Sequence, residues 1–277
     1  MQFPNTQPTN HHTIMQRFDE VCRADARVLA AFLGGSYATG KADVHSDLDL
    51  YLVTTDEAYA AFITAKRNFI RQLGAPLFLE DWGNAHCCFF ILDDGTEGEL
   101  WIGRAGSFAH IHGGPYLVLL DKQEILAHAE FPEHKAEPDA QRRFLQQQIM
   151  GFWHEAGHFS KALARDQEWF AYGSLEAMRR ICANLARLRY NFADGGVGDE
   201  PFFKIEQAMP VEQLAALQAT FCPLEITALR AAGLVIVQFY REVATELAAA
   251  HNLHYPAELE RLALAGLWQF AYEEQSK

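Results

Sequence analysis

Apolar residues follow two different spacings along this chain, and the spacing changes near residue 128. Before that point, short apolar runs and strict apolar–polar alternation predict β-strands, because successive strand side chains point to opposite faces. Strands are expected over residues 28–33, 47–53, 77–82, 86–92, 99–103 and 116–120. Helices are expected over 13–26 and 56–73, and the first dozen residues are expected to form a flexible lead-in.

The second half of the chain follows a polar segment with two prolines, residues 128–138. From there almost to the end, apolar residues recur every three or four positions, which predicts amphipathic helices. These helices are expected over residues 139–164, 167–193, 210–218, 223–251 and 256–273. The predicted fold class is therefore α+β, with an N-terminal domain over 1–127, a linker over 128–138 and an all-α bundle over 139–277.

Charge narrows the classes of ligand that suit the chain. It has 36 acidic residues against 23 Lys and Arg, and a net charge of -13. Proteins that bind a nucleic-acid polymer generally need a basic face, because contacts to phosphate dominate their affinity. We therefore expect no nucleic-acid partner, and a small, cationic substrate fits an acidic protein better.

The five cysteines show no regular spacing, so a disulfide framework is not expected. The first residues, MQFPNTQPTNHH, lack the apolar centre of a signal peptide. No apolar run is long enough to span a bilayer. These features together predict a soluble protein of the reducing cytoplasm that does not associate with membranes.

One segment combines two patterns that carry chemistry. Gly34, Gly35 and Ser36 follow the first predicted strand, and two glycines allow a tight turn that brings the backbone close to a ligand. Free N–H groups at such a turn, together with the Ser36 hydroxyl, suit phosphate oxygens. Asp47 and Asp49 are two positions apart in the next predicted strand, so their carboxylates leave the same face and can share hard cations.

The whole segment, GGSYATGKADVHSDLDLYLV, resembles the signature of the polymerase-beta-like nucleotidyltransferase superfamily. The resemblance implies a small mixed sheet with flanking helices, and a third carboxylate on a strand next to the Asp pair. Glu99 in Gly98-Glu99-Leu100-Trp101 is the preferred third carboxylate, and Glu97 is the second candidate. The length and layout are most similar to the two-domain lincosamide and aminoglycoside nucleotidyltransferases, which act in antibiotic resistance.

This resemblance also implies a mechanism and a set of cofactors. Asp47, Asp49 and Glu99 are expected to bind two Mg²⁺ ions, with Glu99 acting as general base. Gly35, Ser36, Lys41 and Ser46 are expected to hold a nucleoside triphosphate, for which ATP is the first candidate; Ser46 also tightens the turn before Asp47. A nucleoside monophosphate would pass to a hydroxyl of a small antibiotic-like molecule with release of pyrophosphate. A homodimer is expected from the resemblance alone.

Three other functions fit the sequence less well than nucleotidyl transfer to a small molecule. A regulatory, antitoxin-like protein keeps the same core but is usually much shorter, and its helical partner carries Arg-x4-His, which this helical half lacks. An RNA-extending polymerase conflicts with the acidic charge. The segment His154-Glu155-Ala156-Gly157-His158 matches the His-Glu-x-x-His pattern of zinc proteases, but a chain with 12 histidines can match it by chance.

Three further groups of residues receive simpler interpretations. His110 and His112, near a Gly-Gly-Pro turn, are expected to be surface histidines, although they could line the cleft. The basic cluster that begins at Arg179 is expected to form a solvated or dimer-facing surface. The segment Glu80-Asp81-Trp82, at the end of a predicted strand, is a candidate for binding a cationic acceptor.

Overall fold

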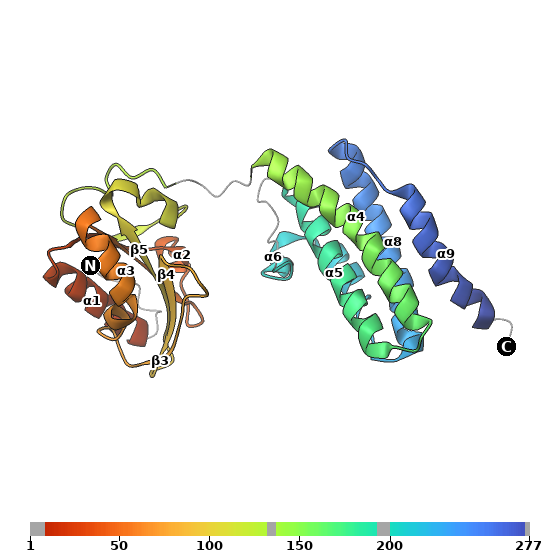
Figure 1. Ribbon diagram of the computed structural model, residues 1–277, viewed down its shortest axis with the longest axis horizontal. Coiled ribbons are helices and arrows are strands. Elements are labelled where there is room, and N and C mark those ends of the chain that lie inside the picture. Colours follow the sequence, from red (N-terminus) through yellow and green to blue (C-terminus); the bar gives the residue numbers. More distant parts are fainter. Residues whose placement is uncertain (1–8, 132–136, 193–199, 275–277) are drawn as a thin grey trace. The chain divides into compact units, whose positions relative to one another are not determined.

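The computed structural model describes residues 9–131, 137–192 and 200–274, with side chains from residue 10 to residue 265 (Figure 1). The chain divides into two compact units, Met1–His134 and Lys135–Lys277, and each unit is described by itself. The predicted linker over 128–138 lies partly outside the described residues. The predicted domain boundaries therefore stay a prediction.

The first unit is built on a six-stranded sheet with the order β3-β4-β5-β2-β1-β6. All neighbouring strands are antiparallel except β2 and β5, which run parallel, so the sheet is mixed as expected. Its strands are β1 (Val28–Leu33), β2 (Leu48–Thr54), β3 (Pro76–Glu80), β4 (Cys87–Leu92), β5 (Glu97–Arg104) and β6 (Leu117–Asp121). Each of them overlaps a strand that the alternation predicts.

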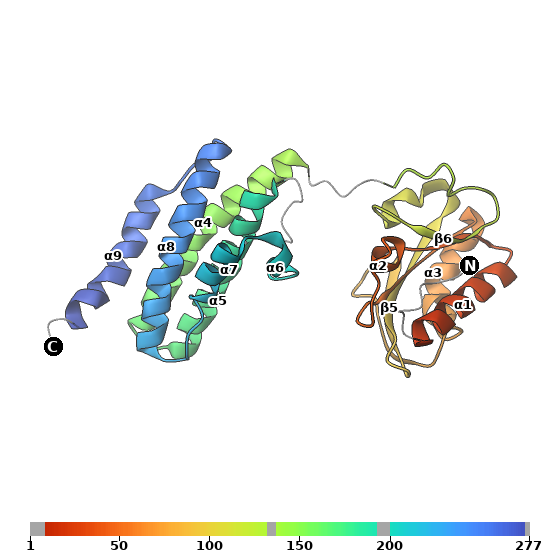
Figure 2. The same cartoon turned by 180° about the vertical axis from the view of Figure 1, so that it is seen from behind.

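Two helices cover one face of the sheet, α1 (Thr9–Ala24) and α3 (Asp56–Ile70) (Figures 1 and 2). The strand positions facing them are apolar, as Leu48, Leu50 and Leu52 of β2 illustrate, and they form one buried core with the helices. Because α1 already begins at Thr9, the expectation of a flexible lead-in is wrong for residues 9–12, whereas residues 1–8 lie outside the described residues. The polar side chains of the site are consequently left to the opposite face.

The opposite face carries a row of aromatic rings across three strands. The ring of Phe32 on β1 stacks on Tyr51 of β2 with centroids 4.8 Å apart, and Tyr51 stacks in turn on Trp101 of β5 at 6.4 Å. His112 packs against Phe32 and Tyr51 and is only 5% exposed. The expectation that His112 lies on the surface is therefore wrong, because the aromatic rings enclose it.

The second unit is helical and has a separate core. Its helices are α4 (Pro138–Leu163), α5 (Glu168–Tyr190), α6 (Ile205–Ala208), α7 (Val211–Gln218), α8 (Ile226–Ala250) and α9 (Ala257–Glu274). Phe152 of α4 stacks on Tyr240 of α8 with centroids 3.7 Å apart, and the Tyr240 hydroxyl donates to the Ile149 carbonyl. The amphipathic spacing thus produces a bundle closed by aromatic packing.

The buried side chain of Arg179 corrects a second expectation. Arg179 on α5 is fully buried, although its neighbours in the sequence suggest a solvated basic surface. Its guanidinium donates to the hydroxyl and the carbonyl of Thr220, both at 2.9 Å, and forms an ion pair with Glu176. The ring of Phe221 lies 3.9 Å from the guanidinium carbon. Partners distant in sequence therefore satisfy a charge that a helical pattern assigns to solvent.

All five cysteines are free thiols. Within the residues that the structure describes, none of the helices combines the length and the apolar character needed to cross a membrane.

Candidate active site

The parallel pairing of β2 with β5 brings together two carboxylates that lie 50 positions apart in the sequence. In this register Asp49 of β2 is the direct partner of Glu99 of β5, and the two carboxyl groups are hydrogen-bonded. Both side chains are half-buried. Directly paired residues point to the same face of a sheet, so the pair lies on the face away from α1 and α3.

The glycine turn after β1 packs directly on this pair. The N–H of Gly34 donates to the carbonyl of Asp49 at 3.0 Å. Gly35 has φ +52°, and a Cβ atom on it would lie 1.8 Å from Asp49 Oδ2. Gly35 is therefore required twice, once for the left-handed backbone and once for the close approach of the turn to the carboxylate.

Ser36 offers a hydroxyl group to a ligand at this turn. It belongs to α2 (Gly35–Ala38), the single helical turn that follows the glycines. Its hydroxyl oxygen is buried and has no hydrogen-bond partner among the described residues. Buried polar atoms are normally satisfied, so an orphaned hydroxyl beside a cluster of carboxylates indicates a place for a bound group. The first N–H groups of a helical turn also lack partners within the helix.

The surroundings of Asp49 disfavour its ionised form. Burial, followed by the nearby charges of Asp47 and Glu99, raises the pKa of Asp49 to about 7. Asp47 itself is exposed and lies one residue before β2. A carboxyl crowded by other carboxylates holds its proton until a cation arrives to offset the repulsion. The site thus favours a positively charged occupant.

Magnesium fits this donor set. Within residues 9–131, 137–192 and 200–274, no three Asp, Glu, His or Cys side chains form a ready-made cage for a metal ion. Mg²⁺ does not require one, because it usually binds through one or two carboxylates, retained waters and the phosphates of its substrate. Hard carboxylate oxygens at Asp49 and Glu99, with Asp47 nearby, suit it better than a soft or nitrogen-binding metal.

The other predicted residues lie around this centre. Lys41 and Glu97 are exposed, and Glu97 opens β5 opposite Ile91 rather than opposite Asp49. The Ser46 hydroxyl accepts from the N–H of Asp43 at 2.9 Å, so it closes the turn before Asp47 as expected. Whether Lys41 and Ser46 also contact a nucleotide stays a prediction.

Two histidine contacts near the site were not predicted from the sequence. His11, in the first turn of α1, is hydrogen-bonded through Nδ1 to the hydroxyl of Tyr37 at 2.6 Å. Both side chains are buried, and burial is the main cause that raises the pKa of Tyr37 to about 12. His112 lies beneath Gly34, where a Cβ atom would approach its ring to 3.0 Å. No local sequence pattern announces either contact, because both join distant segments.

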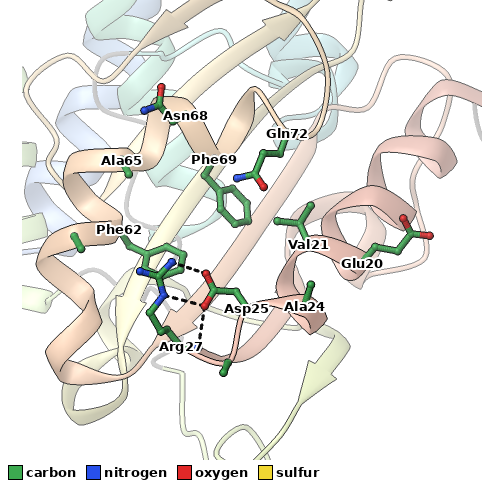
Figure 3. A pocket seen from close by; sticks show the side chains of 12 residues that line it. Glu20, Val21, Ala24, Asp25, Arg27, Phe62, Ala65, Asn68, Phe69 and Gln72 are labelled. Atoms are coloured by element: carbon green, nitrogen blue, oxygen red, sulfur yellow. Dashed lines mark hydrogen bonds and ion pairs between the residues drawn. The ribbon is translucent and has the colours of Figure 1, made fainter.

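A pocket of about 620 Å³ lies on the helix-covered side of the first unit, between α1 and α3 (Figure 3). It is lined by Phe62 and Phe69, and Arg27 at its rim is paired with Asp25 at 2.6 Å. None of the predicted site residues lines it. The pocket and the carboxylates are therefore on opposite faces of the sheet. The candidate active site is the face that carries the carboxylates, not the pocket.

Two solved structures are similar to this chain. An aminoglycoside 6-adenyltransferase from Bacillus subtilis aligns over 92% of this chain and 95% of its own, with 14% identity and a TM-score of 0.42. A nucleotidyltransferase-like protein from Exiguobacterium sibiricum 255-15 aligns over 83% of this chain and 74% of its own, with 11% identity and a TM-score of 0.37. Both likenesses are weak. No curated protein matches the chain.

The sequence profile of one family spans nearly the whole chain. The streptomycin adenylyltransferase profile matches residues 9–265, which include the glycine turn, the carboxylates and the helical unit. A match of this extent does not depend on the short Gly-Ser and Asp-x-Asp patterns alone. This chain belongs to the streptomycin adenylyltransferase family and is a nucleotidyltransferase of the antibiotic-modifying kind.

Proposed function

We propose that this chain transfers the AMP group of ATP to a hydroxyl of an aminoglycoside-like antibiotic, in a magnesium-dependent reaction that releases pyrophosphate. The register of β2 and β5 carries the proposal, because it sets Asp49 beside Glu99 under the glycine turn. The family's name supports an aminoglycoside acceptor, and a lincosamide is the second expectation. Cytoplasmic location and a homodimer remain expectations.

The glycine turn is proposed to hold the β- and γ-phosphates of ATP. Ser36 offers a buried hydroxyl that lacks a partner among the described residues, and Gly35 lets the backbone of the turn lie directly against the Asp49 carboxylate. Backbone N–H groups at the start of a helical turn donate to phosphate oxygens. Lys41, exposed in the loop that follows, is proposed to contact the outer phosphates.

Glu99 is proposed to take the proton of the acceptor hydroxyl. The acceptor oxygen forms a bond to the α-phosphorus, while the bond from that phosphorus to the bridging oxygen breaks and pyrophosphate leaves. Asp49 loses its proton when it binds a cation, and Asp47 adds a further negative charge nearby. These residues mainly position the reactants and balance charge, which are the dominant contributions to phosphoryl chemistry.

Asp47, Asp49 and Glu99 are the residues proposed to hold two Mg²⁺ ions. When bound, the ions would neutralise the charge that develops on the phosphate oxygens. The regulatory, antitoxin-like alternative loses support, because the family profile extends through the helical unit and such proteins are usually shorter.

The test is a transfer assay with labelled ATP, GTP, CTP or UTP, Mg²⁺, and a panel of aminoglycosides and lincosamides. We expect streptomycin or a related aminoglycoside to gain the mass of AMP, with an equal amount of pyrophosphate released. Asp49→Asn should lower the rate by about 10³-fold or more, because it removes a carboxylate on which charge balance depends.

Folding of the Asp49→Asn variant should be checked by circular dichroism, so that lost activity is not mistaken for unfolding. Wild-type protein that modifies none of these compounds, or undiminished turnover by Asp49→Asn, would contradict the proposal.

A further inference from the structure

Three aromatic side chains gather at the free edge of the sheet, on the strands furthest from the glycine turn. We call Phe78, Trp82 and Phe89 the aromatic ledge. The rings of Trp82 and Phe89 meet at a centroid distance of 4.5 Å, and those of Phe78 and Trp82 at 6.1 Å. Trp82 is 67% exposed and Phe78 41%. Large apolar rings grouped on a surface commonly mark a place where something binds.

The ledge lies on the same face as the carboxylates. Phe89 of β4 is the direct partner of Glu99 of β5, and directly paired strand residues point to the same side. Phe78 of β3 is paired with Ile91, which is paired in turn with Glu97. Phe89 is therefore the direct neighbour of Glu99, the proposed general base, whereas Phe78 is separated from Glu97 by Ile91.

The turn that presents Trp82 is firmly built. Trp82 has φ +43°, a left-handed conformation that costs free energy for a bulky residue. The carboxylate of Glu80 accepts the N–H of Trp82 at 3.1 Å. Lys66, 6% exposed, donates to the carbonyls of Asn84 and Ala85 and forms an ion pair with Asp81 at 3.1 Å. A buried lysine thus holds an exposed tryptophan in a fixed place.

The geometry of the proposed reaction says which substrate should meet the ledge. In an in-line displacement the attacking oxygen and the leaving pyrophosphate lie on opposite sides of the α-phosphorus. The glycine turn that would hold the leaving phosphates follows β1, on one side of β2. β5, β4 and β3 extend from the other side of β2. The acceptor should therefore approach over β5 and β4, where the ledge lies.

We infer that the aromatic ledge binds a cationic ring of the acceptor and directs its hydroxyl toward Glu99. This inference rests on the proposed function. Trp82 offers the most favourable aromatic face for a guanidinium or ammonium group, and Phe89 closes the other side of the ledge. Glu97 and Glu99, on the adjoining strand, supply the negative charge that a cationic acceptor requires. The ledge is a determinant of acceptor specificity, whereas the nucleotide is held elsewhere.

The experiment compares steady-state kinetics of the full-length wild type, Trp82→Ala, Trp82→Phe and Leu77→Ala, with ATP, Mg²⁺ and streptomycin. Leu77 is the matched control, because it is another exposed apolar side chain of β3, 75% exposed, but is not one of the three rings of the ledge. Trp82→Ala should raise the KM for streptomycin about tenfold. Trp82→Phe should raise it less, and Leu77→Ala should leave it unchanged.

The KM for ATP should stay within twofold of the wild-type value in all three variants, which separates acceptor recognition from general damage. An unchanged KM for streptomycin in Trp82→Ala would overturn the inference and leave the proposed function standing. A raised KM for ATP with an unchanged KM for streptomycin would place the nucleotide on the ledge instead, and would also overturn it. A wild type that modifies neither streptomycin nor any other compound of the panel would overturn both proposals.

Discussion

Asp49 and Arg179 are ionisable side chains that the fold shields from water, Asp49 in part and Arg179 fully, yet their surroundings differ completely. Arg179 is surrounded by hydrogen-bond acceptors, an opposite charge and an aromatic ring, supplied by Thr220, Glu176 and Phe221. Asp49 faces two further carboxylates, and its pKa is raised to about 7. Burial without compensation is costly for a charge, so only one of the two environments is arranged for stability.

The comparison distinguishes a structural charge from a functional one. In the helical unit, the fold supplies partners for the Arg179 guanidinium, which ties α5 to the segment before α8. At the sheet, the fold brings like charges together and leaves the Ser36 hydroxyl without a partner among the described residues. We propose that such a site gains stability when a cation and phosphate oxygens bind. The gathering of like charges beside the glycine turn is thus a better guide to function here than the concavity between α1 and α3.

The largest effect is expected at Glu99, the proposed general base. Glu99→Gln should lower kcat for adenylyl transfer by about 10²- to 10³-fold, because the amide neither accepts the hydroxyl proton nor carries charge. Glu97→Gln is the matched comparison, on the same strand and the same face; its kcat should stay within twofold of the wild type, and any loss should appear in the KM for the acceptor, because Glu97 adds negative charge for the acceptor but is not the partner of Asp49. Equal losses of kcat in the two variants would show that negative charge anywhere on β5 supports the reaction, rather than the carboxylate paired with Asp49.

The next largest effect is on the stability of the helical unit, through Arg179. Arg179→Ala should lower the free energy of unfolding by about 3 kcal/mol, because it leaves the Thr220 carbonyl and Glu176 without their partner and opens a cavity. Urea denaturation followed by circular dichroism measures it. Arg180→Ala, at the more exposed neighbouring position, should cost less than about 1 kcal/mol. A small effect at Arg179 would mean that its contacts do not stabilise the bundle.

The smallest effect is an increase in the free energy of unfolding, expected for Asp49→Asn. The raised pKa of Asp49 means that, between about pH 4 and pH 7, the unfolded carboxyl ionises while the folded one keeps its proton. Wild-type stability is therefore lost as the pH rises through this range. Asparagine avoids that loss, so Asp49→Asn should stabilise the metal-free protein by roughly 2 kcal/mol at pH 8, after allowance for solvent screening.

The gain in the Asp49→Asn variant should disappear near pH 4, where the wild-type carboxyl is largely protonated in the folded protein and partly so in the unfolded chain. Denaturation in EDTA at the two pH values measures it. A variant that is less stable than the wild type at pH 8 would contradict the idea that like charges strain this site.

Alternation and spacing predicted most of the fold, because strands and helices bury one face each. The strand over 28–33 begins and ends where the short apolar run before Gly34 places it. The start of α1 was predicted four residues late, since its first turn is fixed by the contact of His11 with Tyr37 rather than by a local signal. Contacts between distant segments also explain Arg179, whose partner Thr220 lies 41 residues away.

For the site, sequence identified the residue types but left their pairing open. Glu97 and Glu99 fit the same local pattern, and only the register of β5 against β2 makes Glu99 the partner of Asp49. The closeness of Gly35 to Asp49 was also beyond the sequence, because a glycine motif does not reveal which atom it approaches. The segment Glu80-Asp81-Trp82 was predicted as a possible site for a cationic acceptor. The sequence did not reveal that Lys66 of α3 forms an ion pair with Asp81 and fixes this turn.

The parallel pairing of β2 and β5 also determines where the gene can change length. α3 and the β3–β4 hairpin fill the connection between the paired strands, so an insertion at the Asp93–Gly95 bend would leave the two carboxylates facing each other. Loss of one residue inside β5 would instead move Leu100 into the place of Glu99 and turn the acid toward the helices. The surface loops can therefore vary in length, whereas β5, which carries the proposed base Glu99, cannot.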